Sequence, residues 1–90
     1  MTDRIFLRLS ERWALGYDRN QWIVMRAKFD KSKPRQGWRA IAFVGSTRAV
    51  LMRVLREKGA EIAPDARVAV DSLPETFLEW LAARDRAEAA

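Results

Sequence analysis

Six cationic side chains crowd one short stretch of the chain, and Asp30 is the single acid among them. The six are Arg26, Lys28, Lys31, Lys33, Arg35 and Arg39. Cations on a polar loop reach phosphate oxygens easily, and each phosphate that they neutralise releases counterions, which makes binding steeply salt-dependent. The run therefore predicts a contact surface for a polyanion. The alternative is a solvated loop whose lysines protect sheet edges from aggregation.

A second candidate surface is the outer face of a helix expected over residues 47–58. Arg48, Arg53 and Arg56 fall on this face, with Met52 between them. A methionine among arginines suits an adaptable protein interface, and the same arginines suit contacts with phosphate. A solvated face with one isolated methionine is the alternative.

Tryptophans accompany the basic run. In the expected hairpin, one face carries Trp22, Val24, Arg26 and Lys28 opposite Trp38, Ala40 and Ala42. Such a mixture of indole rings, small residues and cations can stack bases and neutralise phosphates, as in sheet-based binders of single strands. Alternatively, Trp22 and Trp38 belong to the core.

The sequence lacks the residues that most catalytic and metal sites use. It contains no cysteine and no histidine, which removes thiolate zinc sites, disulfides and the commonest general base. No glycine-rich phosphate loop or metalloprotease motif is present, and the carboxylates are scattered along the chain. We therefore expect neither an enzyme nor a metal or cofactor site.

Charge divides the chain into two unequal parts. Residues 1–58 carry 14 Lys and Arg against 5 Asp and Glu, whereas residues 59–90 carry 3 against 7. The net charge of the 90 residues is +5. A length of this order predicts one domain, residues 1–90, and the basic part suggests a polyanionic partner or an acidic protein surface. Neither a signal peptide nor a membrane span is readable, so a cytoplasmic protein without membrane partners is expected.

Hydrophobic periodicity predicts strands first and helices afterwards. Alternation favours strands at residues 4–9, 13–17, 21–29 and 38–44, with Phe6 breaking the first pattern. The period then changes to that of helices at about 47–58 and 73–86, while residues 61–71 favour a helical turn over a strand. This order predicts an α+β fold, in which an antiparallel meander of three to four strands is followed by two or three helices packed on one face.

The packing faces and the helix ends can also be predicted. The residues expected to face the helices are Ile23, Met25, Ala27 and Phe29 on one strand, and Ile41 and Phe43 on the next. Ser46 is the expected N-cap of the first helix and Gly59 its stop. Val50, Leu51, Val54 and Leu55 form its apolar stripe. Ser72 and Glu75 have the spacing of a capping box for the last helix.

Three segments carry a resemblance to known proteins. The segments are Trp13-Ala-Leu-Gly-Tyr-Asp-Arg-Asn-Gln-Trp-Ile-Val, Phe43-Val-Gly-Ser and Leu73-Pro-Glu-Thr-Phe-Leu-Glu-Trp80. Together they resemble small proteins encoded by phages and prophages, a group that brings no assigned activity and no site residues. The resemblance implies the context of a mobile element and, with it, the cytoplasm of a bacterial host.

These observations lead to two main functional hypotheses. The first is a non-catalytic accessory protein that binds nucleic acid or a nucleoprotein through the basic hairpin, with Arg48 and Arg53 extending the surface. The second is a protein-protein inhibitor of a host system, for example an anti-CRISPR or another anti-defence protein. A structural role in virion assembly is a third. The sequence leaves the partner, the sheet register and the oligomeric state open.

Overall fold

The computed structural model describes residues 4–28 and 37–89. Four strands come first: β1 (Arg4–Arg8), β2 (Trp13–Tyr17), β3 (Trp22–Ala27) and β4 (Trp38–Val44). Three helices follow: α1 (Arg48–Glu57), α2 (Pro64–Asp71) and α3 (Phe77–Ala89). The strands form one antiparallel sheet in the order β1-β2-β3-β4. The α+β class and the meander predicted from the sequence are confirmed.

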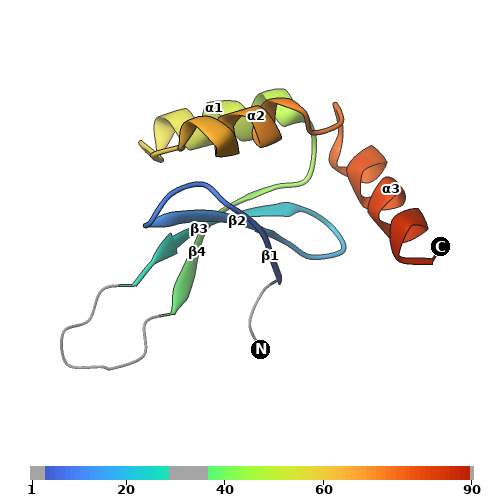
Figure 1. The fold of residues 1–90 in the computed structure, drawn as a ribbon, viewed down its shortest axis with the longest axis horizontal. Helices are drawn as coiled ribbons and strands as arrows, with labels where there is room; N and C mark the ends of the chain where they lie inside the picture. Colours follow the sequence, from blue (N-terminus) through green and yellow to red (C-terminus); the bar gives the residue numbers. More distant parts are fainter. Residues whose placement is uncertain (1–3, 29–36, 90) are drawn as a thin grey trace.

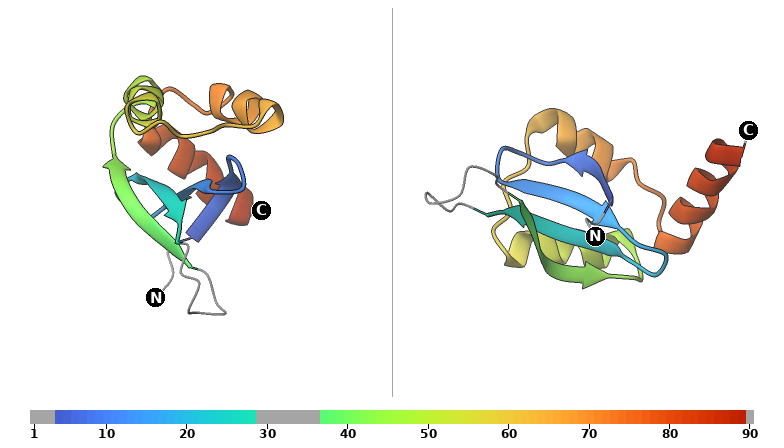
Figure 2. Two further views of the ribbon diagram at one scale, coloured as in Figure 1. Left: turned by 90° about the vertical axis from the view of Figure 1, so that its left-hand side faces the viewer. Right: turned by 90° about the horizontal axis from the view of Figure 1, so that it is seen from below.

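The helices are arranged on one face and at one end of the sheet (Figure 1). α1 and α2 lie above the same face, and α3 stands at the end of the sheet far from the end of β3 and the start of β4. Seen from below, the opposite face of the sheet has α1 and α2 behind it and α3 to one side (Figure 2). We call this second face the open face, because no helix crosses it within the described part of the chain.

An aromatic cluster joins α3 to the sheet. Trp22 and Phe77 are fully buried, and their rings meet edge to face with centroids 5.4 Å apart. The Trp80 ring lies 4.9 Å from that of Tyr17 and 4.6 Å from that of Phe6. Leu51 and Leu55 of α1 complete the helix side of the same core. Aromatic rings bury large areas, which compensates for the small size of the domain.

The prediction of which face of β3 packs on the helices was wrong. Trp22 and Val24 face the helices, together with Val44 of β4. Ile23 and Met25 belong to a separate buried cluster on the open face, and Phe43 is 58% exposed there. Adjacent residues of a strand point to opposite faces, so a wrong choice for one residue reverses the whole strand. Ala27 is half-buried on the open face, and Phe29 lies outside the described residues.

Two irregularities in the ladder change which residues reach the core. The register shifts between Ile5 and Leu7 in β1, at the residue where the sequence alternation breaks, and Phe6 packs against the core. A second shift, between Val24 and Met25, leaves Ile41 of β4 as the extra residue. Ile41 therefore reaches the helix-side core as predicted, although its expected companion Phe43 does not. An extra residue of this kind redirects side chains locally.

The turn between β2 and β3 is stabilised by its own aspartate, as its composition predicts. The Asp18 carboxylate accepts backbone hydrogen bonds from Asn20 at 2.7 Å and Gln21 at 3.0 Å. The bond from the Asn20 N–H, the largest contribution, and those from Gln21 lower the pKa of Asp18, against the smaller opposing effect of burial. This four-residue turn places Tyr17 opposite Trp22.

The N-cap of α1 lies one residue after its predicted position, and the N-cap of α3 lies four residues after its own. Thr47, not Ser46, caps α1 by accepting a hydrogen bond from the Val50 N–H, while Gly59 ends the helix region with a φ of 71° as expected. Residues 64–71 form a full helix. Thr76 caps α3 in place of the predicted Ser72: its hydroxyl accepts a hydrogen bond from the Glu79 N–H and donates one to the Glu79 carboxylate. Ser72 is unavailable because it terminates α2, where its hydroxyl donates to the Val68 carbonyl.

Arg48 fastens the point where the three helices meet. Its guanidinium donates to the backbone carbonyls of Asp71, at 3.1 Å, and of Leu73, while its own N–H donates to the Glu75 carbonyl. The Phe77 N–H donates to Ser46, which pairs the start of α3 with the start of α1. Arg48 is thus half-buried and engaged in structural hydrogen bonds.

We expect Arg48→Ala to lower the free energy of unfolding by about 1.5–3 kcal/mol, because hydrogen bonds from a charged donor contribute that much. The matched control is Arg53→Ala on the same helix, whose exposed ion pair with Glu57 contributes less than about 1 kcal/mol. Urea denaturation of both variants measures the difference. Equal stability of the two variants would contradict this role for Arg48.

Candidate functional site

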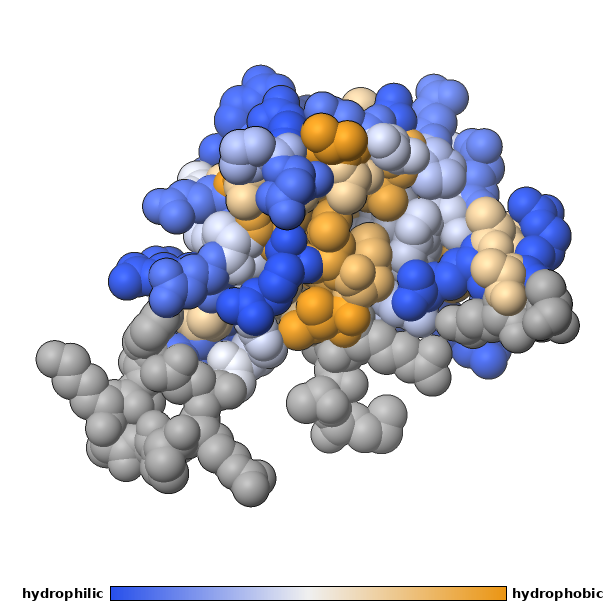
Figure 3. All heavy atoms as spheres, in the orientation of Figure 1, coloured by the Kyte–Doolittle hydropathy of each residue, from blue (hydrophilic) through white to orange (hydrophobic). Residues whose placement is uncertain are grey.

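Cationic side chains surround a hollow at the end of the sheet formed by the end of β3 and the start of β4. The hollow has a volume of about 850 Å³. Its lining consists of four cationic residues and three apolar ones: Arg12, Arg26, Lys28 and Arg39 with Ala27, Ala40 and Ile41. Strongly hydrophilic side chains gather at this end of the molecule, where the β1–β2 turn lies, whereas hydrophobic surface lies nearer the middle (Figure 3).

Antiparallel pairing brings the cations together. Arg26 lies directly opposite Arg39 in the β3–β4 ladder. The Lys28 N–H donates to the Gly37 carbonyl at 2.8 Å, which continues this ladder one step beyond the strands. On the other side, the Ala27 N–H donates to the Arg12 carbonyl at 2.8 Å, so the start of β2 lies beside the end of β3. Three segments of the chain thus supply the charges of one hollow.

The pair of Arg26 and Arg39 is unfavourable for folding. Like charges directly opposite each other in a sheet are destabilising, and opposite charges there contribute about 0.2–1 kcal/mol. The Arg26 guanidinium partly offsets this cost because it lies over the Trp13 ring, 5.5 Å from the centroid. Both arginines are exposed, so their guanidinium groups stay hydrated. A bound anion would remove the repulsion between them.

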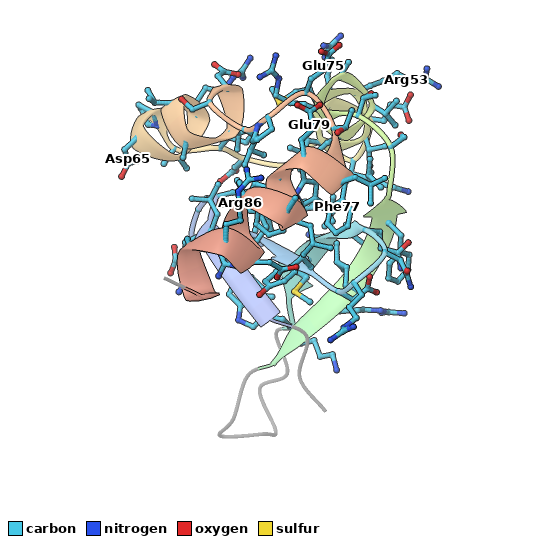
Figure 4. The ribbon with its side chains drawn as sticks, turned by 90° about the vertical axis from the view of Figure 1, so that its right-hand side faces the viewer. Arg53, Asp65, Glu75, Phe77, Glu79 and Arg86 are labelled. Atoms are coloured by element: carbon cyan, nitrogen blue, oxygen red, sulfur yellow. The ribbon has the colours of Figure 1, made fainter. Side chains whose placement is uncertain are left out.

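Acidic side chains of the described residues leave this hollow positive. Arg53 pairs with Glu57 at 3.1 Å and Arg67 with Asp71 at 3.6 Å, each within one helix. Neither pair includes Arg26, Lys28 or Arg39, and no described carboxylate forms an ion pair with these three. Glu75 and Glu79 lie at and just before the start of α3, with Arg86 farther along it (Figure 4). The described carboxylates of residues 59–90 therefore form no ion pair with Arg26, Lys28 or Arg39.

The other residues predicted for a binding surface do not line the hollow. Lys31, Lys33 and Arg35 lie outside the described residues. Arg53 and Arg56 are exposed on α1, and Arg53 extends away from the body of the molecule (Figure 4). Met52, expected on the exposed face of α1, is instead partly buried against the core. Arg48 lies at the start of α1, where its guanidinium holds the helix junction.

Arg12 is the one cation of the hollow that the sequence analysis missed. The signal was present in the β2–β3 hairpin, because pairing Tyr17 with Trp22 across a four-residue turn places position 12 opposite position 27. Counting back along this ladder would have added Arg12 to the basic run.

Two further features are absent from the described residues. In that part of the chain, no three carboxylates come close enough together to hold a metal ion. None of its helices is both long and apolar enough to span a membrane.

Comparison with known proteins adds no family. The chain matches no protein-family model, no curated protein and no solved structure. The fold and the hollow are therefore the features that bear on function.

Proposed function

We propose that this protein binds nucleic acid, free or within a nucleoprotein, and that it does so without catalysis. Phosphate groups of the ligand enter the hollow and contact Arg26, Lys28 and Arg39, with Arg12 at its rim. The cluster of four cations around one hollow is the observation that carries the proposal. Phosphate contacts of this kind position a ligand but carry little sequence information, so sequence specificity is expected to be low.

The stability cost of the hollow supports a role in binding. A purely structural sheet end has no need of two arginines in direct cross-strand register. Solubility alone would be served equally well by charges spread over the surface. Grouping the positive charge in one concave place raises the local concentration of an anionic ligand and accelerates its association.

The test is binding of labelled oligonucleotides of about 12 nucleotides by fluorescence anisotropy, in about 50 mM and 200 mM salt. We expect the double variant Arg26→Ala/Lys28→Ala to bind about tenfold more weakly at the lower salt. The slope of log K against log salt should decrease by about 1.4–1.8, because two phosphate contacts are lost.

The matched control for this experiment is Arg67→Ala/Arg86→Ala. It removes the same two charges from exposed positions on α2 and α3, away from the hollow. An equal loss of affinity in both double variants would show that only net charge matters and would rule out the hollow as the binding site. Absence of binding by the unmodified protein at low salt would sink the proposed function itself.

The same charges also complement an acidic protein surface, so a protein partner is the other outcome of interest. Capture from a host lysate before and after nuclease treatment separates the two. A partner lost on nuclease treatment supports the proposal. A partner that binds the hollow and survives the treatment overturns it in favour of a protein-protein inhibitor.

A further inference from the structure

The open face of the sheet carries two rows of side chains that run across the strands. One row, Arg8, Ala14, Met25 and Ala40, follows from successive cross-strand pairs. The other contains Ile5, Gly16, Ile23 and Phe43. Small or buried residues occupy the middle of both rows, while Ile5 and Phe43 at the ends of the second row are 38% and 58% exposed.

A cation and an indole ring meet across the first row. The Arg8 guanidinium lies over the Trp38 ring, 5.0 Å from its centroid, although the two residues belong to opposite edge strands. They can meet because the residues between them on this face include the small side chain of Ala14. The guanidinium also donates to the Ser10 carbonyl at 3.4 Å and the Glu11 carbonyl at 3.1 Å. Arg8 is thus held in place while remaining exposed.

The open face is continuous with the hollow. Ala40 lines the hollow and also packs in the open-face cluster beside Trp38. A ligand whose phosphates occupy the hollow therefore has Trp38 and Arg8 as its next neighbours, with Phe43 farther along β4. Bases of single strands stack on aromatic rings and on guanidinium planes, whereas the bases of a duplex are already stacked inside it.

We propose that the ligand of this protein is a single-stranded nucleic acid, whose bases stack on the open face at Phe43 and at the pair of Arg8 and Trp38. This inference rests on the proposed function and specifies its substrate class. A single strand is the favoured occupant of the open face because the Arg8 guanidinium, the partly exposed Trp38 ring and the exposed Phe43 ring occur together there. A wholly apolar or wholly acidic partner would not match this combination. Stacking tolerates every base, so sequence preference remains weak.

The first experiment compares Phe43→Ala with Leu78→Ala. Both replace an exposed apolar side chain, but Leu78 is 70% exposed on α3 and lies outside the sheet. The probes are an oligothymidylate of about 12 nucleotides, a duplex of equal length and an abasic strand of equal charge. We expect Phe43→Ala to weaken binding of the oligothymidylate about five- to hundredfold, the value of one stacked base, and to leave the abasic strand and the duplex unchanged.

The second experiment uses the fluorescence of Trp38. Trp13, Trp22 and Trp80 are 6%, 0% and 8% exposed, so Trp38 is the one tryptophan that is not buried. Stacking of a base on or beside it should quench the intrinsic fluorescence during titration with oligothymidylate. The quenching should be absent with the abasic strand, and absent in Trp38→Phe.

The outcomes separate this inference from the proposed function. Equal affinity for the three probes, together with no effect of Phe43→Ala, would overturn base stacking and leave phosphate binding at the hollow intact. Failure of every probe to bind would overturn both. A second copy of the chain on the open face would instead give a dimer by light scattering that Phe43→Ala dissociates, and that result would also overturn the inference.

Discussion

Arg39→Glu is expected to make the protein more stable and, at the same time, a weaker binder of oligonucleotides. The substitution replaces a repulsive cross-strand pair with an attractive one, because position 39 lies directly opposite Arg26. The free energy of unfolding should rise by about 0.5–1.5 kcal/mol. Affinity should fall by about ten- to a hundredfold at low salt, because one phosphate contact is lost and a negative charge enters the hollow.

Stability is predicted to rise while affinity falls, and a general loss of structure would not produce both changes. A variant that binds poorly because it is misfolded loses stability, whereas Arg39→Glu should gain it. Urea denaturation gives the first quantity and fluorescence anisotropy the second. Arg39→Gln is the matched control, since it removes the charge without reversing it. It should raise the stability and lower the affinity, each by less than Arg39→Glu does. Reduced stability with unchanged affinity would show that the two arginines serve the fold instead of a ligand.

The sequence predicts the elements of this fold better than it predicts the orientation of its sheet. Alternation located all four strands, and even the break at Phe6 marks a shift of register. The wrong face was chosen for β3 because its residues were judged alone. The turn at Asp18 pairs Tyr17 with Trp22 and Leu15 with Val24, so the aromatic side of β2 fixes the aromatic side of β3. Residues of adjacent strands in register share a face, and the combined row decides which side is buried.

Competition between neighbouring signals explains the misplaced start of the last helix. Ser72 and Thr76 are each followed three residues later by a glutamate, so the sequence offers two capping boxes in succession. Which of them acts depends on where α2 ends. Because α2 continues to Asp71, Ser72 becomes its C-cap and Thr76 starts α3. A prediction of α2 as only a helical turn left Ser72 available.

The sequence predicts only part of the candidate site, because it shows which cations are neighbours in the chain but not which distant ones meet in the fold. Local density of charge pointed to Arg26, Lys28 and Arg39, which do share a hollow. It could not reveal Arg12, which is distant in sequence and joins them through the β2–β3 ladder. Nor could it show that Arg48 is occupied, because the carbonyls that accept its hydrogen bonds lie more than 20 residues away in the chain. Non-local pairing decides which cations meet.

Trp80→Ala is expected to destabilise the aromatic cluster that joins α3 to the sheet. The Trp80 side chain is 8% exposed and its ring contacts those of Phe6, Tyr17 and Phe77. Removing a buried tryptophan costs about 3–5 kcal/mol, a large part of the 5–15 kcal/mol that stabilise a typical domain. The melting temperature should fall by more than about 12 °C.

The loss should extend to α3 as a whole. A helix of 13 residues is marginal in water by itself, so its helicity depends on docking. The Arg84 guanidinium lies 5.3 Å from the centre of the Trp80 ring and donates to the Tyr17 hydroxyl at 3.1 Å. In Trp80→Ala it would lose the contact with the indole ring. Circular dichroism should therefore show reduced helix content in Trp80→Ala below the melting transition. Leu78→Ala is the exposed control on the same helix, and its free energy of unfolding should stay within about 0.5 kcal/mol of that of the parent.

The oligonucleotide affinity of Trp80→Ala, compared with that of the parent, tests whether α3 contacts the ligand. The aromatic cluster and the hollow lie at opposite ends of the sheet, since α3 contacts the start of β3 and the hollow adjoins its end. At a temperature where the variant is still folded, its affinity for an oligonucleotide should therefore match that of the parent. Reduced affinity under those conditions would mean that α3 itself contacts the ligand, so that the binding surface extends beyond Phe43 onto α3.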